Sequence, residues 1–348
     1  MMQRHTTLSP ATSPSEDAPI LVTSQEAARI YRVHASSVKR WCDAGELPCR
    51  LTAGGHRRIA LEDLVAFGRQ TGLTMPLAAF GDQLNAVWRA SSQAGEGHFD
   101  ALVDLWFGWL MADEPGLLDP SMGLLLDRGL SLAAVLDQGL GRLMRRIGDA
   151  WEEGRIRIGD EHRASEHVMD ALHALRGRLQ PLPRPADALQ RAVVGAAEGD
   201  PHHLGAFMVR LVLEQRGLTV NYLGANVPGE EFAAQQQRWG ADLVCVSFTP
   251  PRGQADAVRL VRSLAQGYDP ARPYHLALGG VALEGKVVDP PYRPFGSFAV
   301  MGSLVDLVAW LDGRRVRADL MPGLAATDLS ATVSTVGEDR HPTSWRSS

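Results

Sequence analysis

Hydrophobic residues recur with a helical period in the middle of the chain, between residues 76 and 182. Apolar side chains return there every three or four positions, which places them on one face of a helix. One such face consists of Leu136, Leu140, Leu143, Ile147 and Trp151. Clusters of glycine and proline interrupt the pattern, so the segment predicts a four-helix bundle.

The period changes between residues 188 and 316. Short apolar runs alternate there with longer helical stretches; the runs are RAVVGAA, LTVNYLG, DLVCVSF, YHLALGG and FAVMG. Strands that alternate with helices form a parallel sheet that is covered on both faces. We therefore expect a flavodoxin-like, doubly wound α/β domain, which binds its ligand beyond the carboxyl ends of its strands.

Residues 20–75 predict a winged helix-turn-helix in this multidomain α and α/β protein. Thr23 and Glu26 match a capping box that opens a short helix. Ser36 or Ser37 is expected to cap a second helix, which ends at Gly45. The sequence LPCRLTAGGHRRI then predicts a β-hairpin with glycines at its tip. Two short helices across a tight turn can seat a recognition helix in a DNA major groove.

Positive charge is concentrated in this N-terminal segment. The chain has a net charge of −5, but residues 21–72 contain eight Lys or Arg against five Asp or Glu. Such a local excess favours contacts with DNA phosphates, which weaken as salt increases. A protein-interaction module with solvated arginines is the alternative. The candidate DNA-binding residues are Ser36, Ser37, Lys39, Arg40, His56, Arg57 and Arg58.

The composition is that of a globular protein with several cores, since hydrophobic residues make up 45% of the chain and charged residues 22%. Residues 1–19 and 317–348 lack periodicity and predict flexible tails. The sequence has neither a signal peptide nor an apolar run that could span a bilayer, so we expect a cytoplasmic protein without membrane contacts. Cys42, Cys49 and Cys245 are scattered, which argues against a disulfide framework or a zinc site.

The motif that carries chemistry follows the first predicted strand of the sheet, in the sequence EGDPHHLG. Asp200, His202 and Gly205 spell DxHxxG. The His202 imidazole can offer one nitrogen to a metal while Asp200 accepts a hydrogen bond from the other. Gly205 would let a flat ligand approach the backbone. His203 is expected to be a structural or surface residue.

Two segments resemble known families. SQEAARIYRVHASSVKRWCDAGEL followed by GGHRRI resembles the winged-helix domain of the MerR family. DxHxxG resembles the motif of cobalamin-binding domains, whose two further marks lie after later strands. They are present here as Ser247 with Thr249, where Thr249 replaces a Leu of that family, and as Gly279 with Gly280.

The second resemblance implies a metal ligand and a path for the cofactor. His202 would replace the dimethylbenzimidazole base of the cofactor as the lower ligand of cobalt. The displaced nucleotide tail would then pass Ser247 and the small residues Gly279 and Gly280.

The predicted bundle contains a further motif, in which Trp151 is followed after nine residues by Glu161 and His162. Taken alone, this pattern is typical of a helix with Trp151 as a core anchor. Beside DxHxxG it resembles the helical cap of CarH-type and LitR-type photoreceptor regulators. That resemblance implies that these three residues, together with Ile158, shelter the 5′-deoxyadenosyl group of adenosylcobalamin. The implied cofactor is thus adenosylcobalamin rather than methylcobalamin.

The order of the three domains, 20–75, 76–182 and 188–316, is that of the same regulators. It implies a transcriptional regulator, in the first instance a repressor, without enzymatic activity. Such a protein binds double-stranded operator DNA in the dark as a homo-oligomer, dimer or tetramer, and is nucleoid-associated when bound. The implied switch is a change of oligomeric state when light breaks the Co–C bond.

One position departs from this resemblance. Glu152 stands where relatives have a histidine that ligates cobalt after photolysis. Three outcomes stay open: His162 closes the site, water holds the light state, or the protein detects cobalamin without using light. Two other functions also stay open, namely a corrinoid-carrying module of a methyltransferase system and a regulator whose sheet has lost the cofactor and binds a protein.

Overall fold

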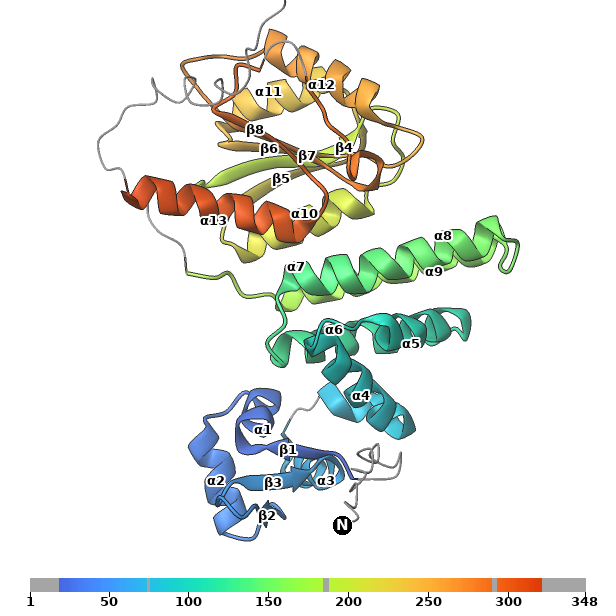
Figure 1. The fold of residues 1–348 in the computed structure, drawn as a ribbon, viewed down its shortest axis with the longest axis vertical. Coiled ribbons are helices and arrows are strands. Elements are labelled where there is room, and N and C mark those ends of the chain that lie inside the picture. Colours follow the sequence, from blue (N-terminus) through green and yellow to red (C-terminus); the bar gives the residue numbers. More distant parts are fainter. Residues whose placement is uncertain (1–18, 74–75, 184–187, 290–292, 321–348) are drawn as a thin grey trace, which may run out of the picture.

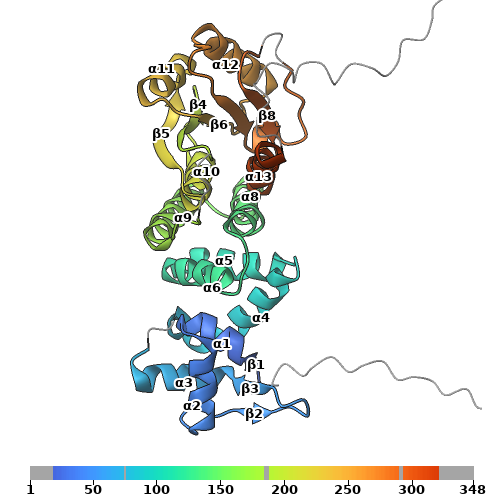
Figure 2. The ribbon, with the colours of Figure 1, turned by 90° about the vertical axis from the view of Figure 1, so that its left-hand side faces the viewer.

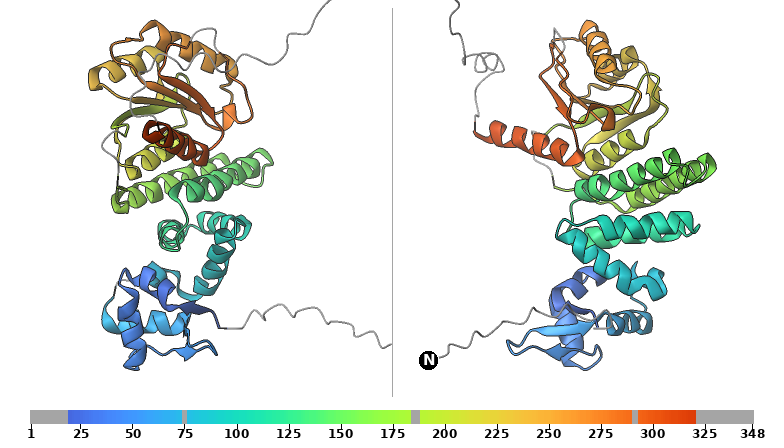
Figure 3. Two further views of the ribbon diagram at one scale, coloured as in Figure 1. Left: turned by 60° about the vertical axis from the view of Figure 1, so that its left-hand side comes forward. Right: turned by 45° about the vertical axis from the view of Figure 1, so that its right-hand side comes forward.

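The computed structural model describes residues 19–73, 76–183, 188–289 and 293–320. They form three units stacked along the long axis of the molecule: an N-terminal unit, a helical bundle and a sheet domain (Figures 1 and 3). Apart from residues 19 and 317–320, the two predicted tails lie outside the described residues. Among the helices described, none is both long and apolar enough to cross a membrane.

The N-terminal unit is the predicted winged helix-turn-helix. Its strands pair antiparallel in the order β1-β3-β2. The hairpin of β2 and β3 is confirmed, whereas β1, which pairs with β3, was not predicted. The elements are β1 (Leu21–Thr23), α1 (Ser24–Tyr31), α2 (Ala35–Asp43), β2 (Arg50–Leu51), β3 (Arg57–Ala60) and α3 (Leu61–Thr71).

The caps of the two helices of the motif differ in how well they were predicted. The capping box of Thr23 and Glu26 is confirmed, because the side chain of each residue accepts a hydrogen bond from the backbone N–H of the other residue. The predicted cap of α2 is wrong. His34 caps this helix through Nδ1, which accepts from the N–H of Ser36 at 3.3 Å. Gly45 follows the end of α2 with a φ of 73°, as expected at this position.

The bundle differs from the predicted four helices: α7, the π-helical segment η3 and α8 follow one another without a break, and α4, α5, α6 and α9 are separate helices. Its helices are α4 (Leu84–Gly95), α5 (Asp100–Met111), α6 (Leu118–Asp127), α7 (Leu132–Ala134), α8 (Arg142–Glu152) and α9 (Ile158–Arg178). Shorter helical turns are η1 (Pro76–Gln83), η2 (Pro115–Leu117) and η3 (Val135–Gly141), which is π-helical and runs into α8.

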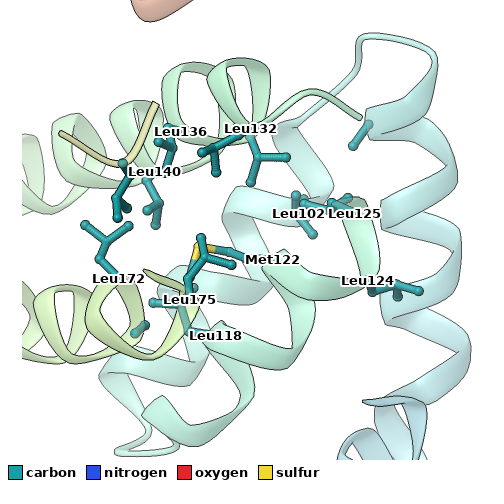
Figure 4. Close-up of a cluster of buried hydrophobic side chains, with 14 of the residues drawn as sticks. Leu102, Leu118, Met122, Leu124, Leu125, Leu132, Leu136, Leu140, Leu172 and Leu175 are labelled. Atoms are coloured by element: carbon teal, nitrogen blue, oxygen red, sulfur yellow. The ribbon is translucent and has the colours of Figure 1, made fainter. Parts of the chain in front are cut away.

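The core of the bundle lies between α5, α6, η3, α8 and α9. Figure 4 shows Met122 and Leu118 of α6 beside Leu175 and Leu172 of α9. The predicted apolar face is fully buried at Leu136, Leu140, Leu143 and Ile147. The predicted face therefore packs into the core over most of its length, but Trp151 at its end is 45% exposed.

The sheet domain has the predicted doubly wound architecture. All its strands are parallel, in the order β5-β4-β6-β7-β8, and α10 with α13 covers one face while α11 with α12 covers the other (Figures 1 and 2). The strands are β4 (Arg191–Ala197), β5 (Thr219–Val227), β6 (Leu243–Ser247), β7 (His275–Gly279) and β8 (Ser297–Met301). The helices are α10 (Leu204–Gln215), α11 (Gly229–Trp239), α12 (Gln254–Gln266) and α13 (Leu304–Leu320), with the turn η4 (Val281–Leu283). Thus α13 continues beyond residue 316, where the sequence placed the end of the domain.

Specific contacts join the bundle to the sheet domain. Asp137 of η3 accepts hydrogen bonds from the first backbone N–H groups of α13, those of Leu304 and Val305, at 3.1 and 2.9 Å. Arg176 of α9 donates two hydrogen bonds to Glu214 of α10, at 2.6 and 2.9 Å. These contacts connect η3 and α9 of the bundle to α13 and α10 of the sheet domain.

Candidate functional site

The loop after β4 presents an imidazole with one nitrogen already engaged. The Nδ1 atom of His202 lies 3.1 Å from Oδ1 of Asp200, and the His202 N–H donates to the same oxygen at 3.0 Å. The His202 side chain is 61% exposed, whereas that of Asp200 is 1% exposed. A buried carboxylate thus orients an exposed ring, and Nε2 is the nitrogen left for an external ligand.

Asp200 also ties this loop to the ends of two neighbouring strands. Its Oδ2 accepts from the N–H of Thr249, beyond β6, at 2.6 Å. Its backbone carbonyl accepts from the N–H of Asn226, near the end of β5, at 2.9 Å. Asn226 in turn accepts from the Gly199 N–H at 2.6 Å and has a φ of 53°. Sequence reasoning missed Asn226, and an Asn near a strand end is the only signal that could have pointed to it.

His203, the next residue, makes a separate contact through its backbone. Its backbone carbonyl accepts a hydrogen bond from the hydroxyl of Tyr222 at 3.2 Å. Burial raises the pKa of Tyr222 to about 12, so this hydroxyl keeps its proton at neutral pH. This contact involves only the backbone of His203, so the structural or surface role of its side chain stays a prediction.

The glycines of the motif are needed for packing of the chain itself. A Cβ on Gly205 would lie 2.7 Å from the Oγ of the buried Ser247, closer than such atoms approach. Gly205 was predicted to let a ligand approach the backbone. The close approach of Ser247 is a second reason why this position requires glycine. Gly280 has a φ of 103°, and a Cβ there would lie 2.4 Å from the Phe248 carbonyl oxygen. A Cβ on Gly279 would lie 3.0 Å from the Met301 carbonyl oxygen.

Trp151 does not act as a core anchor. It is 45% exposed, although Ile147, one turn earlier on the same face, is fully buried. Ile158, at the start of α9, is 50% exposed. The interpretation of Trp151 as a core residue is therefore wrong, and the tip of the α8–α9 hairpin presents two large apolar side chains to the outside.

The tip of this hairpin extends past the sheet on the side of His202. His173 of α9 lies against Phe207 of α10, with 4.5 Å between ring centroids, and further along both helices Arg176 meets Glu214. The two helices therefore run in the same direction. At 1.5 Å per residue, α9 begins about 22 Å before His173, whereas α10 begins only about 5 Å before Phe207. The hairpin thus projects about 17 Å beyond the start of α10, and Figure 1 shows it extending to the right of the sheet domain.

Glu161 and His162 lie on this projecting part of α9. The Nδ1 atom of His162 is 2.5 Å from Oε2 of Glu161, and Oε1 of Glu161 accepts from the Ser165 hydroxyl at 2.9 Å. The His162 side chain is 71% exposed and that of Glu161 is 24% exposed. Glu152, at the end of α8, is exposed as well. The structure therefore brings the predicted cap residues together at one tip.

These residues fit a large flat group with a metal at its centre. His202 offers a ring held at one nitrogen, and the exposed Trp151 and Ile158 supply apolar surface on the hairpin that extends past the sheet on the same side. In the described ranges, no group of three or more His, Cys, Asp or Glu could hold a bare metal ion.

The predicted DNA-binding residues divide into exposed and engaged ones. Ser36, Lys39, Arg40 and His56 are exposed, and Ser37 is half-buried. Arg57 is paired with Asp43 and Arg58 is half-buried, so the wing does not present both arginines freely as expected. Arg50 on β2 is exposed as well. It is one of the eight basic residues of this segment but was not predicted to contact DNA.

Two cysteines of the N-terminal unit, Cys42 and Cys49, lie close to each other. Burial and a hydrogen bond with Cys49 raise the pKa of Cys42 to about 12, so its thiol is protonated at neutral pH. Cys42 and Cys49 are both free thiols.

Comparison with known families identifies the domains. A helix-turn-helix domain model matches residues 21–71, a B12 binding domain model matches 190–286, and a second B12 binding domain model matches 119–176. These matches confirm the predicted helix-turn-helix and cobalamin-binding domains. The third match covers much of the bundle, which includes Trp151, Ile158, Glu161 and His162.

Two kinds of relative are found among characterised proteins. The HTH-type transcriptional repressor CarH of Myxococcus xanthus is 24% identical over 261 residues, which are 69% of this chain and 84% of the relative. Dimethylamine corrinoid protein 2 of Methanosarcina acetivorans is 26% identical over 133 residues, 37% of this chain. This chain spans 61% of the length of that corrinoid protein. Among solved structures, the monomethylamine corrinoid protein of Methanosarcina barkeri aligns with a TM-score of 0.45 and 20% identity, over 64% of this chain and 98% of that one.

Proposed function

We propose that this chain, which joins a helix-turn-helix to B12-binding domains in the manner of a CarH-type regulator, binds cobalamin through His202 and controls transcription accordingly. The observation that carries the proposal is the exposed His202 ring, held at Nδ1 by the buried Asp200. Nε2 of this ring would be the protein's ligand to cobalt. Such a role needs a fixed tautomer and an accessible nitrogen, and His202 has both.

The cofactor in this proposal is adenosylcobalamin, which supplies a Co–C bond that light can break. Trp151 and Ile158, exposed on the projecting hairpin, would cover the adenosyl group and exclude water from it. Loss of that group would remove the contact that holds hairpin and sheet edge together. Because Glu152 occupies the position of the relatives' histidine, three outcomes stay open: His162 closes the site, water holds the light state, or the protein detects cobalamin without using light.

The output in this proposal is repression by an oligomer on operator DNA, in the cytoplasm. Lys39, Arg40 and His56 are exposed on α2 and the wing, where they would contact phosphates and bases. A dimer or tetramer presents several such heads, which raises affinity for a repeated operator without new contacts. A change in oligomeric state then suffices to release the DNA.

The test combines spectroscopy with DNA binding. The purified chain is incubated with adenosylcobalamin in the dark, and its absorption spectrum is recorded before and after green light. We expect a spectrum typical of histidine-ligated cobalamin, which changes on illumination, and loss of that ligation in His202→Ala. Unchanged free-cofactor spectra for the wild-type chain would refute the proposal.

The DNA arm separates the regulator from a corrinoid-carrying module of a methyltransferase system. Fragments of the source genome are selected on the cofactor-loaded protein at two salt concentrations. A regulator enriches discrete fragments at both, whereas a corrinoid carrier has no preference among them. Enrichment that depends on cofactor but not on light would identify a cobalamin sensor that does not use light.

A further inference from the structure

Arg252 lies beside the loop that carries His202. It follows Thr249 by three residues, and its backbone N–H donates to the Thr249 carbonyl at 3.0 Å. Its guanidinium packs on Gly199: a Cβ added there would lie 2.9 Å from both Cζ and Nη2 of Arg252. Gly199 directly precedes Asp200, so this cation lies at the same edge of the sheet as the candidate metal ligand.

The guanidinium of Arg252 has few hydrogen-bond acceptors within the described part of the protein. Nε of Arg252 is buried and has no hydrogen-bond partner in the part of the chain that the structure describes. The nearest paired carboxylate is that of Asp256, 3.9 Å from Nη1, at the outer limit of an ion pair. Asp256 is itself engaged, because it accepts from the Gly253 N–H at 2.9 Å and pairs closely with Arg259.

A buried N–H without an acceptor is rare in folded proteins, because removing the group from water is costly. The Arg252 side chain is also one-third exposed, so its outer nitrogens can reach a ligand at the sheet edge. A guanidinium that is anchored by packing and short of acceptors is suited to bind anionic or carbonyl oxygens.

We infer that Arg252 is a corrinoid-binding residue, whose guanidinium donates to acceptor oxygens of the cofactor beside His202. The inference rests on the proposed function and adds a residue to it. A cobalamin offers such oxygens in two places, the phosphodiester of its nucleotide tail and the carboxamides around its ring. Both are hydrogen-bond acceptors, and the experiment below distinguishes them.

The experiment compares two cofactors in the purified full-length chain. Adenosylcobinamide has the corrin ring and its carboxamides but lacks the nucleotide tail with its phosphodiester. Dissociation constants for adenosylcobalamin and adenosylcobinamide are measured by absorption titration in the dark, for the wild type, Arg252→Ala and Arg252→Gln. The matched control is Arg259→Ala, which removes the other guanidinium that pairs with Asp256; this side chain is 67% exposed.

We expect both Arg252 variants to bind adenosylcobalamin roughly tenfold to a hundredfold more weakly, with Arg259→Ala unchanged. A loss confined to adenosylcobalamin identifies the phosphodiester as the partner. An equal loss for both cofactors identifies the carboxamides. Thermal unfolding of each variant checks that the fold is intact, and Arg252→Gln preserves side-chain bulk if Arg252→Ala is unstable.

Wild-type affinity for both cofactors in both Arg252 variants would overturn the inference while leaving the proposed function intact. If the wild-type chain binds neither cofactor, the proposed function itself is wrong and the inference fails with it. The two failures are therefore distinguishable in one set of titrations.

Discussion

Thr249 and Asp200 are joined by a hydrogen bond of 2.6 Å from the Thr249 backbone N–H to Asp200 Oδ2, although 49 positions separate them. The bond uses a backbone donor, so it does not depend on the side chain at 249. This explains in physical terms how Thr can replace the Leu expected there without loss of the loop geometry. It also leaves Oδ1 of Asp200 free to hold His202.

Asp200→Asn should weaken both the fold and the site. The amide retains one oxygen, so its NH₂ must face either the Thr249 N–H or the two His202 donors. We expect a loss of about 1–3 kcal/mol in the free energy of unfolding and a loss of about tenfold to a hundredfold in corrinoid affinity. Urea unfolding and absorption titration measure the two effects. Glu198→Gln, in the exposed part of the same loop, is the control and should match the wild type.

Gly205→Ala should destabilise the protein by about 1–3 kcal/mol, because the new methyl group would overlap the Ser247 hydroxyl. Ser247→Ala in the same chain removes that oxygen and should restore a large part of the loss. A double-mutant cycle of unfolding free energies measures this coupling. Additive effects of the two substitutions would show that the close approach is not what requires glycine.

Trp151→Ala and Ile147→Ala form a matched pair on one helix face. Ile147 is fully buried, so its truncation should cost about 2–5 kcal/mol in unfolding free energy. Trp151 is 45% exposed, so its truncation should cost little when no cofactor is added. Bound adenosylcobalamin should raise the melting temperature of the wild type more than that of Trp151→Ala. An equal increase in both would remove Trp151 from the proposed cap.

Lys39→Ala and Arg57→Ala should differ in their effect on DNA binding. Lys39 is exposed, so its loss should reduce the salt dependence of operator affinity by about one unit of log–log slope. Arg57 is paired with Asp43, so its loss should mainly lower the thermal stability of the N-terminal unit. Affinities measured at several salt concentrations, together with melting curves, separate the two. A slope change as large for Arg57 as for Lys39 would contradict the assignment.

Glu214 should make the joint between bundle and sheet sensitive to acid. Burial raises its pKa, but hydrogen bonds from Arg176 and Arg210 outweigh burial and bring the pKa of Glu214 below its ordinary value. The unfolded chain therefore takes up this proton first as the pH falls, so the contribution is complete above about pH 4.5 and is lost below it.

The comparison of wild type with Glu214→Gln isolates this group from the other carboxyls. Because Glu214 is partly exposed, the stability difference at pH 7 should be on the order of 1 kcal/mol. It should shrink towards zero as urea unfolding is repeated from pH 6 to pH 3.5. A difference that persists at the lowest pH would show that the carboxylate charge is not its source.

The sequence alone determined the order of domains, the helical and strand segments and the DxHxxG motif, because these are local patterns. The period of Leu136, Leu140 and Leu143 follows from helix geometry, and the alternation of strands and helices after residue 188 follows from burial of a parallel sheet. The capping box of Thr23 and Glu26 involves residues three apart and was predictable for the same reason.

Only the tertiary structure decided which of these side chains are exposed and which are held by partners. A period of 3.6 assigns Trp151 to a face but does not say where the helix that packs on that face ends. The partners of Arg57 and Asp200, and the packing of Arg252 on Gly199, join residues distant in sequence. Such contacts depend on how whole elements pack against each other, and no local pattern of residues encodes them.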